Sequence, residues 1–423
     1  MLDIKFIREN PDTIKQALIS RNAEADVDGL LEFDGLRRTA ITEAERLKTE
    51  RNSASKKIGG LMKEGKRDEA EAAKENVRTI GDRISILDEQ VRSLDEKILQ
   101  IILYIPNLPV ETVPVGKDET DNPVLRTWGA AKKVDFEVKP HWDITEALHL
   151  VDFERGAKIT GSGFPVYMGQ GAKLQRALIS YMLDLHTTEH GYTEVEPPFV
   201  CNADSMTGTG QLPKFAEDMY STGTDEFYLI PTAEVPVTNL YREEILDVNE
   251  PIKLTAYTPC FRREAGAAGR DNRGLLRLHQ FDKVEMVNFV KPEQSAAQHE
   301  ILIGEAESVL QKLGLHYRVI ELCTADLGFS AAKCYDIELW APGVERWLEV
   351  SSVSNFGDYQ ARRARIRCRD ENGKTQLVHT LNGSGVALPR LVVAIIENYQ
   401  NADGTVTLPE VLRPYMGGLE KLG

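Results

Sequence analysis

The chain has 423 residues, a length that predicts more than one domain. It is 42% hydrophobic and 28% charged, which is typical of a globular protein in water, and its apolar runs are far too short to cross a bilayer, so we expect no membrane association. The formal net charge of −15 argues against indiscriminate binding to DNA or RNA, but it permits a local basic surface.

A helical hairpin is predicted from about residue 29 to residue 102. Charge is dense there, proline is absent, and apolar residues recur at spacings of three and four, which is typical of two packed helices. Gly59, Gly60 and Gly65 permit a reversal between the helices. An arm of roughly 30–35 residues at about 1.5 Å per residue reaches about 50 Å. The seam comprises Phe33, Ala40, Ala44, Leu47, Ala54, Ile58 and Leu61, with Arg37 and Arg51, then Ala70, Ala73, Val77, Ile80, Ile84, Leu87, Val91, Leu94, Ile98 and Ile101.

The two predicted helices differ in charge. Residues 37–67 carry ten basic and four acidic side chains, whereas residues 68–97 carry five basic and nine acidic ones. A basic helix on an acidic protein favours a directed contact with the phosphates of a nucleic acid. The alternative is the solvated face of a coiled coil, which is the commoner explanation for a charged hairpin taken alone.

Four prolines without periodicity mark residues 105–123 as a linker. Beyond it, short runs typical of strands are joined mainly by turns, which favours an antiparallel sheet and an α+β fold. We therefore divide the chain into a helical arm (1–104), the linker and a second domain (124–423). We expect strands at 226–230, 254–261, 276–290, 317–322, 334–340 and 347–351, and helices at 172–190, 293–313 and 392–400.

The stretch from 254 to 290 predicts an antiparallel hairpin, with a mobile, positively charged loop at 265–274. On its first strand, Arg262 can bind a phosphate or a carboxylate through two hydrogen bonds. Glu264 lies two residues on, hence on the same strand face, and can accept from an adenine amine. Phe281 on the return strand can stack beneath a purine. Taken alone, Arg262 and Glu264 are more simply explained as a surface ion pair.

Two later segments combine polar side chains with close backbone approach. Glu349 and Ser351 share a strand face by alternation, and a carboxylate beside a hydroxyl can hold Mg²⁺ against phosphates, although an ordinary strand end is the alternative. Gly383 and Gly385 let the backbone approach a ligand, and Arg390 at a predicted helix start can clamp a terminal phosphate. The alternative for this segment is a turn followed by a helix with an exposed arginine, with no role in ligand binding.

Several other chemistries have no sequence support. The chain contains no Walker-type phosphate loop, no Rossmann fingerprint in its proper context, no Ser-His-Asp order and no H-E-x-x-H motif. The five cysteines are scattered, odd in number and without a C-x-x-C pair, which argues against a disulfide framework or a zinc site and fits a reducing cytoplasm. We also expect no secretory signal.

Four motifs taken together resemble those of a known family. They are TAEVP at 232–236, FRREAGAAGRDNRGLLRLHQFDKVE at 261–285, EVSS at 349–352, and LNGSG at 381–385 before Arg390. In this order they are similar to the signature motifs of class II aminoacyl-tRNA synthetases, and more narrowly to the seryl-tRNA synthetases of the bacterial, zinc-free type. The resemblance extends over almost the whole chain, including the helical arm and the IPNLP sequence of the linker.

The resemblance implies a set of site residues. It assigns catalysis to Arg262 and Arg390, and Mg²⁺ binding with ATP to Glu349 and Ser352. It assigns dimer formation to Pro198 with the helix and strand before it. The implied ATP-binding residues are Arg262, Arg263, Glu264, Phe281, Glu349, Val350, Ser351, Ser352 and Arg390. The implied serine-binding residues are Thr232, Ala233, Glu234, Glu285, Asn382 and Ser384.

The resemblance also implies a class II core and the activity of a serine–tRNA ligase. Such an enzyme activates L-serine with ATP to seryl-adenylate, releases pyrophosphate, and transfers serine to the 3′ end of tRNA(Ser), and also of tRNA(Sec). The expected assembly is a cytoplasmic homodimer that requires Mg²⁺. We expect it to contain no zinc and to bind no DNA. The chain departs from the family pattern at Arg263, where many members have a small residue, and at Pro389, where many have glycine; we expect only local effects from either.

Two rival interpretations remain open. A synthetase paralogue could load the activated amino acid onto a protein carrier, but such relatives lack a basic tRNA-gripping arm. A non-catalytic RNA-binding or coiled-coil scaffold could keep the same fold. The second rival conflicts with the presence of Arg262, Glu264, Glu285, Glu349 and Arg390.

Overall fold

The computed structural model describes residues 1–265 and 273–423. Within this part the chain forms two compact units. One comprises Leu2–Ile19 with Ala23–Pro106, and the other comprises Met1, Ser20–Asn22 and Asn107–Gly423. Most of the loop that we expected to be mobile and positively charged lies outside the described residues.

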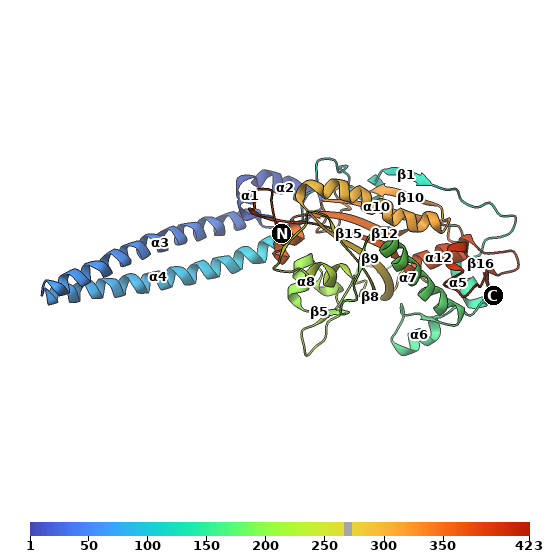
Figure 1. Ribbon diagram of the computed structural model, residues 1–423, viewed down its shortest axis with the longest axis horizontal. Coiled ribbons are helices and arrows are strands. Elements are labelled where there is room, and N and C mark those ends of the chain that lie inside the picture. The colour runs from blue at the N-terminus through green and yellow to red at the C-terminus, as the bar shows by residue number, and fades with distance from the viewer. Residues whose placement is uncertain (266–272) are drawn as a thin grey trace. The chain divides into compact units, whose positions relative to one another are not determined.

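The first unit is dominated by two long helices, α3 (Val27–Lys63) and α4 (Arg67–Ile102), which lie side by side in Figure 1. Every predicted apolar seam position is buried or half-buried, which confirms the coiled-coil arm. The seam arginine Arg37 pairs with Asp95 of the facing helix, so its charge is compensated across the seam. The short helices of this region are α1 (Ile4–Glu9) and α2 (Pro11–Ser20).

The reversal between α3 and α4 is tighter than we expected. Gly59 and Gly60 remain inside α3, so assigning them to the turn was wrong. Both face open space, and a glycine in an exposed helical position costs only about 1 kcal/mol relative to alanine. Gly65 alone serves the reversal, because its φ of 77° lies in the left-handed region that a side chain disfavours.

The second unit is built on an eight-stranded sheet with the order β1-β10-β11-β12-β15-β9-β8-β4. Its neighbouring strands are antiparallel except for the parallel pair β4 and β8, which confirms an α+β fold with a mainly antiparallel sheet. Its strands are β1 (Val124–Trp128), β4 (Thr193–Glu194), β8 (Ile252–Phe261), β9 (Gln280–Val290), β10 (Tyr317–Glu321), β11 (Lys333–Ala341), β12 (Arg346–Gly357) and β15 (His379–Ala387).

Helices and short strands surround this sheet. The helices are α5 (His141–Ala147), α6 (Phe153–Ile159), α7 (Gln170–Thr188), α8 (Ala203–Thr209), α9 (Glu234–Asn239), α10 (Ser295–Lys312), α11 (Tyr359–Ala364) and α12 (Leu388–Asn398). The short strands are β2 (Val151–Asp152), β3 (Val166–Tyr167), β5 (Val200–Cys201), β6 (Tyr228–Leu229), β7 (Ile245–Leu246), β13 (Arg367–Arg369), β14 (Thr375–Leu377), β16 (Val406–Thr407) and β17 (Lys421–Leu422).

Strand β9 separates the main core from the functional face. Its residues Val284 and Met286 join a large apolar core with residues of α7, α10 and α12. The alternating residues Lys283 and Glu285 point to the other face of the sheet, because successive side chains of a strand point in opposite directions. The same alternation that builds the core therefore presents charged groups on the opposite side.

Most of the expected elements are present, with one informative exception. The predicted β8–β9 hairpin is confirmed, but the return strand begins at Gln280 rather than at Leu276. The segment before it is apolar because Leu275, Leu276 and Leu278 are buried in the main core, and not because they belong to a strand. Among the described residues, no helix combines the length and apolar character needed to span a bilayer.

Candidate functional site

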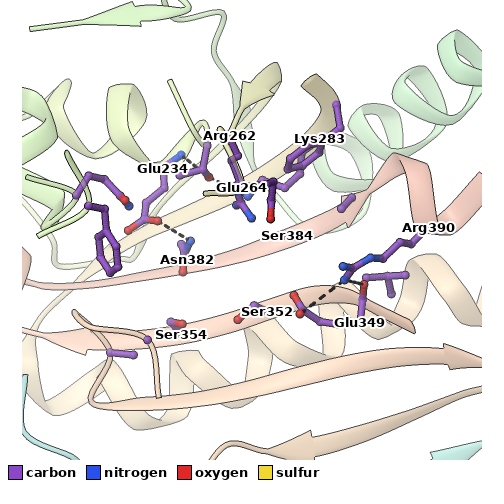
Figure 2. A pocket seen from close by; sticks show the side chains of 18 of the residues that line it. Glu234, Arg262, Glu264, Lys283, Glu349, Ser352, Ser354, Asn382, Ser384 and Arg390 are labelled. Atoms are coloured by element: carbon purple, nitrogen blue, oxygen red, sulfur yellow. Dashed lines mark hydrogen bonds and ion pairs between the residues drawn. The ribbon is translucent and has the colours of Figure 1, made fainter. Parts of the chain in front are cut away.

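A cavity of about 510 Å³ lies over strands β9, β12 and β15, beside the segment that follows β8 (Figure 2). Helices α9 and α12 each contribute a charged side chain to its wall, Glu234 and Arg390. The structure brings together most of the residues that the sequence singled out. Those that line the cavity are Thr232, Glu234, Arg262, Glu264, Phe281, Glu349, Val350, Ser352, Asn382, Ser384 and Arg390.

The other predicted residues lie outside the cavity wall. Arg263 is exposed, and its backbone N–H donates to the carbonyl of Asp218. Ala233 is fully buried in an apolar cluster. Glu285 is fully buried directly behind the cavity wall, where it contacts Asn382, so it belongs to the site without facing the open space.

A β-bulge decides which residues of β12 face the cavity. The pairing of β12 with β11 shifts between Ile337 and Glu338, so that one extra residue of β12 is accommodated. The expectation that Glu349 and Ser351 share a face is therefore wrong. Ser351 donates to the carbonyl of Ser384 at 2.6 Å instead, while Glu349 and Ser352 both line the cavity.

One end of the cavity is a buried cluster of charged and amide groups. The Lys283 ammonium lies 2.5 Å from the Glu285 carboxylate and donates to the Thr232 hydroxyl at 2.8 Å. The Asn382 amide donates to Glu285 at 2.7 Å and to Glu234 at 3.2 Å. Asn382 thus bridges two carboxylates, of which only one has an ion-pair partner in this cluster.

The electrostatics of Glu234 follow from that imbalance. Burial, followed by repulsion from Glu285, raises the pKa of Glu234 from 4.5 to about 7, although hydrogen bonding from Gln360 and the charge of Lys283 act in the opposite direction. Gln360 lies on α11 with no exposed surface, donates to Glu234, and accepts from the Thr380 hydroxyl at 2.8 Å. Gln360 and Asn382 therefore orient the carboxyl of Glu234, and the charges of Lys283 and Arg262 only partly offset the effect of burial on its pKa.

An arginine and an aromatic ring form the middle of the cavity. The Arg262 guanidinium lies 5.2 Å from the centre of the Phe281 ring, and its Nε donates to the Pro231 carbonyl at 3.3 Å. Glu264 forms an ion pair with Arg277. The planar arginine and the ring together can hold an anion beside an aromatic base.

Glu264 reaches this position by a route that strand alternation does not describe. We expected Arg262 and Glu264 to share a strand face, but strand β8 ends at Phe261, before either residue. That expectation is therefore wrong. The φ of Glu264 is 51°, and this left-handed turn brings its side chain back to the wall that Arg262 also lines.

The other end of the cavity carries Arg390 and Glu349. Arg390 donates from one nitrogen to the carbonyl of Glu349 at 2.8 Å and from Nε to the carbonyl of Leu276 at 3.1 Å. Its guanidinium also lies 3.7 Å from the Glu349 carboxylate. Pro389 occupies the first turn of α12, where a fixed φ suits the helix start, and so fixes the approach of Arg390.

The oxygen atoms of Glu349 and Ser352 could hold a divalent cation. Behind them, burial and then the charge of Glu349 raise the pKa of Asp336 well above its usual range, so this carboxyl favours its neutral form and leaves Glu349 as the charged ligand. The described residues contain no group of three ligating side chains that would enclose a metal. This donor set fits Mg²⁺, which binds through one or two carboxylates and takes its other ligands from phosphates and water.

The sequence reasoning missed several site residues. Lys283 stands two residues before Glu285 on the same strand face, so alternation offered a signal for it. Gln360 comes from a helix far along the chain and had no such signal. Ser354 also lines the cavity, two residues beyond Ser352 on β12, and its hydroxyl donates to the Cys334 sulfur at 3.2 Å.

Comparison with known proteins gives consistent matches. Residues 216–399 match the tRNA synthetase class II core domain (G, H, P, S and T), and residues 1–109 match the seryl-tRNA synthetase N-terminal domain. The chain is 57% identical to the serine–tRNA ligase of Carboxydothermus hydrogenoformans over 99% of this chain and 98% of that one. It is 55% identical to that of Pelotomaculum thermopropionicum, with full coverage of both.

A solved structure is similar over the whole length. The seryl-tRNA synthetase of Pyrococcus horikoshii, crystallised with ATP, superposes with a TM-score of 0.92 at 40% identity and covers 100% of this chain and 99% of that one. The likeness therefore includes the arm, the core and every segment that lines the cavity.

Proposed function

We propose, because this chain belongs to the seryl-tRNA synthetase family, that it activates L-serine with ATP and transfers the serine to the 3′ end of tRNA(Ser). Members of this family are ATP-dependent aminoacyl-tRNA ligases, and this chain is one of them. We assign the steps of the reaction to the residues of the cavity below.

The charge imbalance at the buried end of the cavity carries the assignment of the amino-acid pocket. Glu234 and Glu285 supply two carboxylates, and Lys283 supplies one ammonium. A second ammonium, that of the substrate, would balance the cluster and let Glu234 ionise. The Thr232 hydroxyl, which accepts from Lys283, and Ser384, which lines the same cavity, supply the groups that recognise a substrate hydroxyl. A site that satisfies a substrate hydroxyl rejects an analogue lacking it by about 10⁴–10⁵, so alanine is excluded.

The nucleotide binds along the rest of the cavity in this proposal. Phe281 stacks on the adenine, Glu264 accepts from its amine, and Arg262 holds the α-phosphate together with the serine carboxylate. Arg390 binds the terminal phosphate at the other end. The support for this order is that Arg262 lines the same cavity as Glu234 and the Glu349–Arg390 pair, so one extended ligand can contact all three.

Glu349 and Ser352 would hold Mg²⁺ when ATP is bound, and the ion would supply positive charge against the phosphates. In this structure the Glu349 carboxylate lies 3.7 Å from the Arg390 guanidinium. We expect the two side chains to separate when phosphates bind, because the phosphates compete for Arg390. The cysteines of the chain are buried and unpaired, and we propose no role for zinc.

The reaction proceeds in two steps. A carboxylate oxygen of serine attacks the α-phosphorus of ATP, the bond to the β-phosphate breaks, and pyrophosphate leaves. A hydroxyl of the terminal ribose of the tRNA then attacks the acyl carbon, and AMP leaves. The protein forms no covalent bond in either step. Its contribution is positioning of the reactants and stabilisation of the charge that develops on the phosphorus oxygens.

The arm provides the second substrate contact in this proposal. Helix α3 carries the excess of basic side chains, and a long helical hairpin can follow a protruding RNA arm through its phosphates and 2′-hydroxyls. We propose tRNA(Ser) as the main partner and tRNA(Sec) as a second one. The location is the cytoplasm, where both are charged.

We also propose that the enzyme acts as a homodimer. The segment that follows Pro198 exposes large apolar side chains, with Phe199 at 38% and Val200 at 40% of their accessible surface. Adjacent exposed apolar side chains are typical of a surface that a partner covers. Light scattering at micromolar concentration tests this directly, since a monomer mass would refute it.

Serine-dependent exchange of pyrophosphate into ATP tests the proposed activation step. We expect exchange with serine, none with alanine, and little with threonine. Exchange that depends on another amino acid would refute the assignment. Normal exchange without any transfer to serine tRNA would instead favour a relative that loads a protein carrier.

A further inference from the structure

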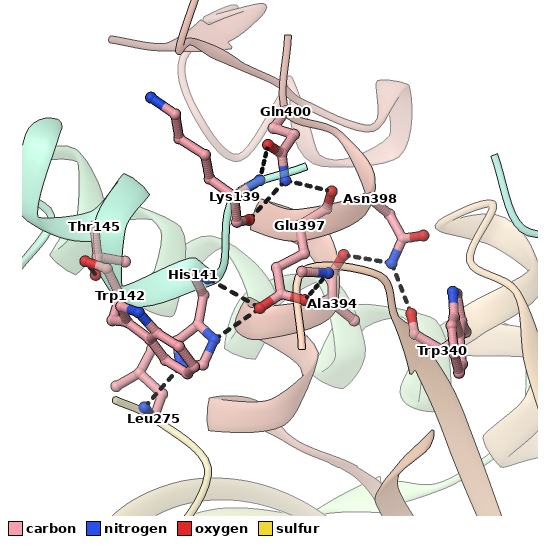
Figure 3. A network of polar contacts seen from close by, with 11 residues as sticks. Lys139, His141, Trp142, Thr145, Leu275, Trp340, Ala394, Glu397, Asn398 and Gln400 are labelled. Carbon is pink, nitrogen blue, oxygen red and sulfur yellow. Dashed lines mark hydrogen bonds and ion pairs between the residues drawn. The ribbon is translucent and has the colours of Figure 1, made fainter. Parts of the chain in front are cut away.

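A buried carboxylate and a buried imidazole are hydrogen-bonded to each other between helices α12 and α5 (Figure 3). Glu397, near the end of α12, is 1% exposed and His141, at the start of α5, has no exposed surface. Glu397 accepts from the His141 backbone N–H at 2.9 Å, from His141 Nδ1 at 2.8 Å, and from the Gly343 N–H at 2.8 Å. Neither residue touches the cavity, and neither has a role in the reaction described above.

The hydrogen bonds fix the tautomer of His141. The backbone N–H of Leu275 donates to Nε2 at 3.1 Å. An amide N–H can only donate, so Nε2 carries no proton, and the ring proton must lie on Nδ1, facing Glu397. The carboxylate therefore orients a neutral imidazole whose free nitrogen acts as a fixed acceptor for one backbone amide.

The backbone passes this ring so closely that only glycine fits beside it. Gly274 has a φ of 68°, and a Cβ placed on it would lie 2.2 Å from Nε2 of His141. The backbone segment Lys139–His141 is itself anchored, because the Gln400 side chain donates to the Lys139 carbonyl at 3.0 Å and accepts from its N–H at 2.9 Å. The position of Nε2 is thus constrained by the close backbone at Gly274 and by the anchored backbone of residues 139–141.

The next residue of the segment belongs to the cavity. The carbonyl of Leu276 accepts from Nε of Arg390, and Leu276 itself lines the cavity. Arg390 and Glu397 stand at opposite ends of the same helix, α12. Two consecutive residues are therefore tied to the two ends of one helix, Leu275 through His141 and Glu397, and Leu276 directly to Arg390.

We propose that His141 is a positioning residue for the nucleotide half of the site. Its unprotonated Nε2 holds Leu275, which places the Leu276 carbonyl where it orients Arg390 for a terminal phosphate. This inference rests on the proposed ATP-binding role of Arg390. The amino-acid pocket contains no part of the His141–Glu397 pair, so the two halves of the site should respond differently to its loss.

Two substitutions separate the two hydrogen bonds of the ring. In His141→Asn, the amide can replace Nδ1 as the donor to Glu397, but nothing accepts from Leu275. In His141→Gln, the longer side chain can place an oxygen where Nε2 stands, but Glu397 loses its side-chain donor. We expect H141N to raise the KM for ATP about 5- to 10-fold, the effect of losing one hydrogen bond, and to leave the KM for serine unchanged.

Pyrophosphate exchange with ATP and serine titrated separately provides the readout. H141Q should retain a KM for ATP closer to that of the parent, although both variants should unfold at a lower temperature. The control is His316→Asn, whose ring lies near the edge strand β1 and bonds to the Trp128 carbonyl. Gly274→Ala, which forces the segment away from the ring while keeping His141 and Glu397, should also raise the KM for ATP.

The outcomes are distinct. An unchanged KM for ATP in H141N and G274A, with only a lower unfolding temperature, would show a purely structural role and overturn the proposal. Equal effects on ATP and serine would overturn it as well. Should H141N fail to fold, G274A alone decides. The parent enzyme is assayed first. If it shows no serine-dependent exchange, the proposed function is wrong, and the variants then say nothing about His141.

Discussion

The raised pKa of Glu234 predicts how serine use depends on pH. In the free enzyme this carboxyl titrates at about 7, because it is buried beside Glu285. Its ionised fraction is then about 0.9 at pH 8 and about 0.1 at pH 6. A substrate ammonium needs the ionised form, and affinity scales with the fraction of competent protein. The kcat/KM for serine should therefore fall about tenfold as the pH drops from 8 to 6.

The direction of this effect follows from the sign of the shift. A carboxyl with a raised pKa keeps its proton up to a higher pH, so acidification removes the negative charge that serine requires. In Glu234→Gln the charge is absent at every pH, and the same tenfold step should disappear, while the overall kcat/KM for serine is lower throughout. The variant shares any titration of serine itself, so the difference between the two profiles isolates Glu234.

Pyrophosphate exchange at pH 6, 7 and 8, with ATP saturating, measures both profiles. The KM for ATP serves as an internal control. Glu234 and Arg390 lie at opposite ends of the cavity, so the charge of Glu234 should leave this KM unchanged. A wild-type profile that is flat between pH 6 and pH 8 would refute the reasoning. So would an E234Q profile with the same step, because the titrating group would then lie elsewhere.

Three further variants have defined outcomes. Arg262→Ala should lower serine-dependent exchange by about 10- to 100-fold, as expected for one lost charge-assisted contact, with little change in unfolding temperature; near-normal exchange would sink the assignment. Gln360→Glu places a third carboxylate against Glu234 and should lower both kcat/KM for serine and the unfolding temperature, and an unchanged KM would exclude an orienting role. The double variant Lys56→Glu and Lys57→Glu should weaken tRNA charging and reduce its salt dependence while exchange is unaffected; unchanged charging would remove this face of α3 from the RNA contact.

Periodic patterns predicted the large elements because their physical cause is local. The alternation of three and four along 70–101 predicts a seam that buries one helix face, and that face is buried. The alternation in 280–290 similarly predicts a strand with Val284 and Met286 in the core and Glu285 opposite. These patterns need no knowledge of distant residues.

The errors arise where a distant contact overrides the local pattern. Leu275 and Leu276 are apolar like the strand that follows, yet the first donates to His141 and the second accepts from Arg390, so the segment leaves the sheet. The bulge in β12 moves Ser352 into the cavity in place of Ser351, and no spacing in EVSS indicates it. Gln360 reaches Glu234 from a separate helix, which a sequence pattern does not reveal.

Formation and transfer of seryl-adenylate test the central claim most directly. The enzyme is mixed with serine, ATP and Mg²⁺ in a single turnover, and the enzyme-bound product is identified by mass. Serine tRNA is then added without further ATP. We predict a bound seryl-adenylate that disappears as serine becomes esterified to the terminal ribose, with AMP released in equal amount. The absence of the adenylate, or its persistence when the tRNA is present, would contradict the account.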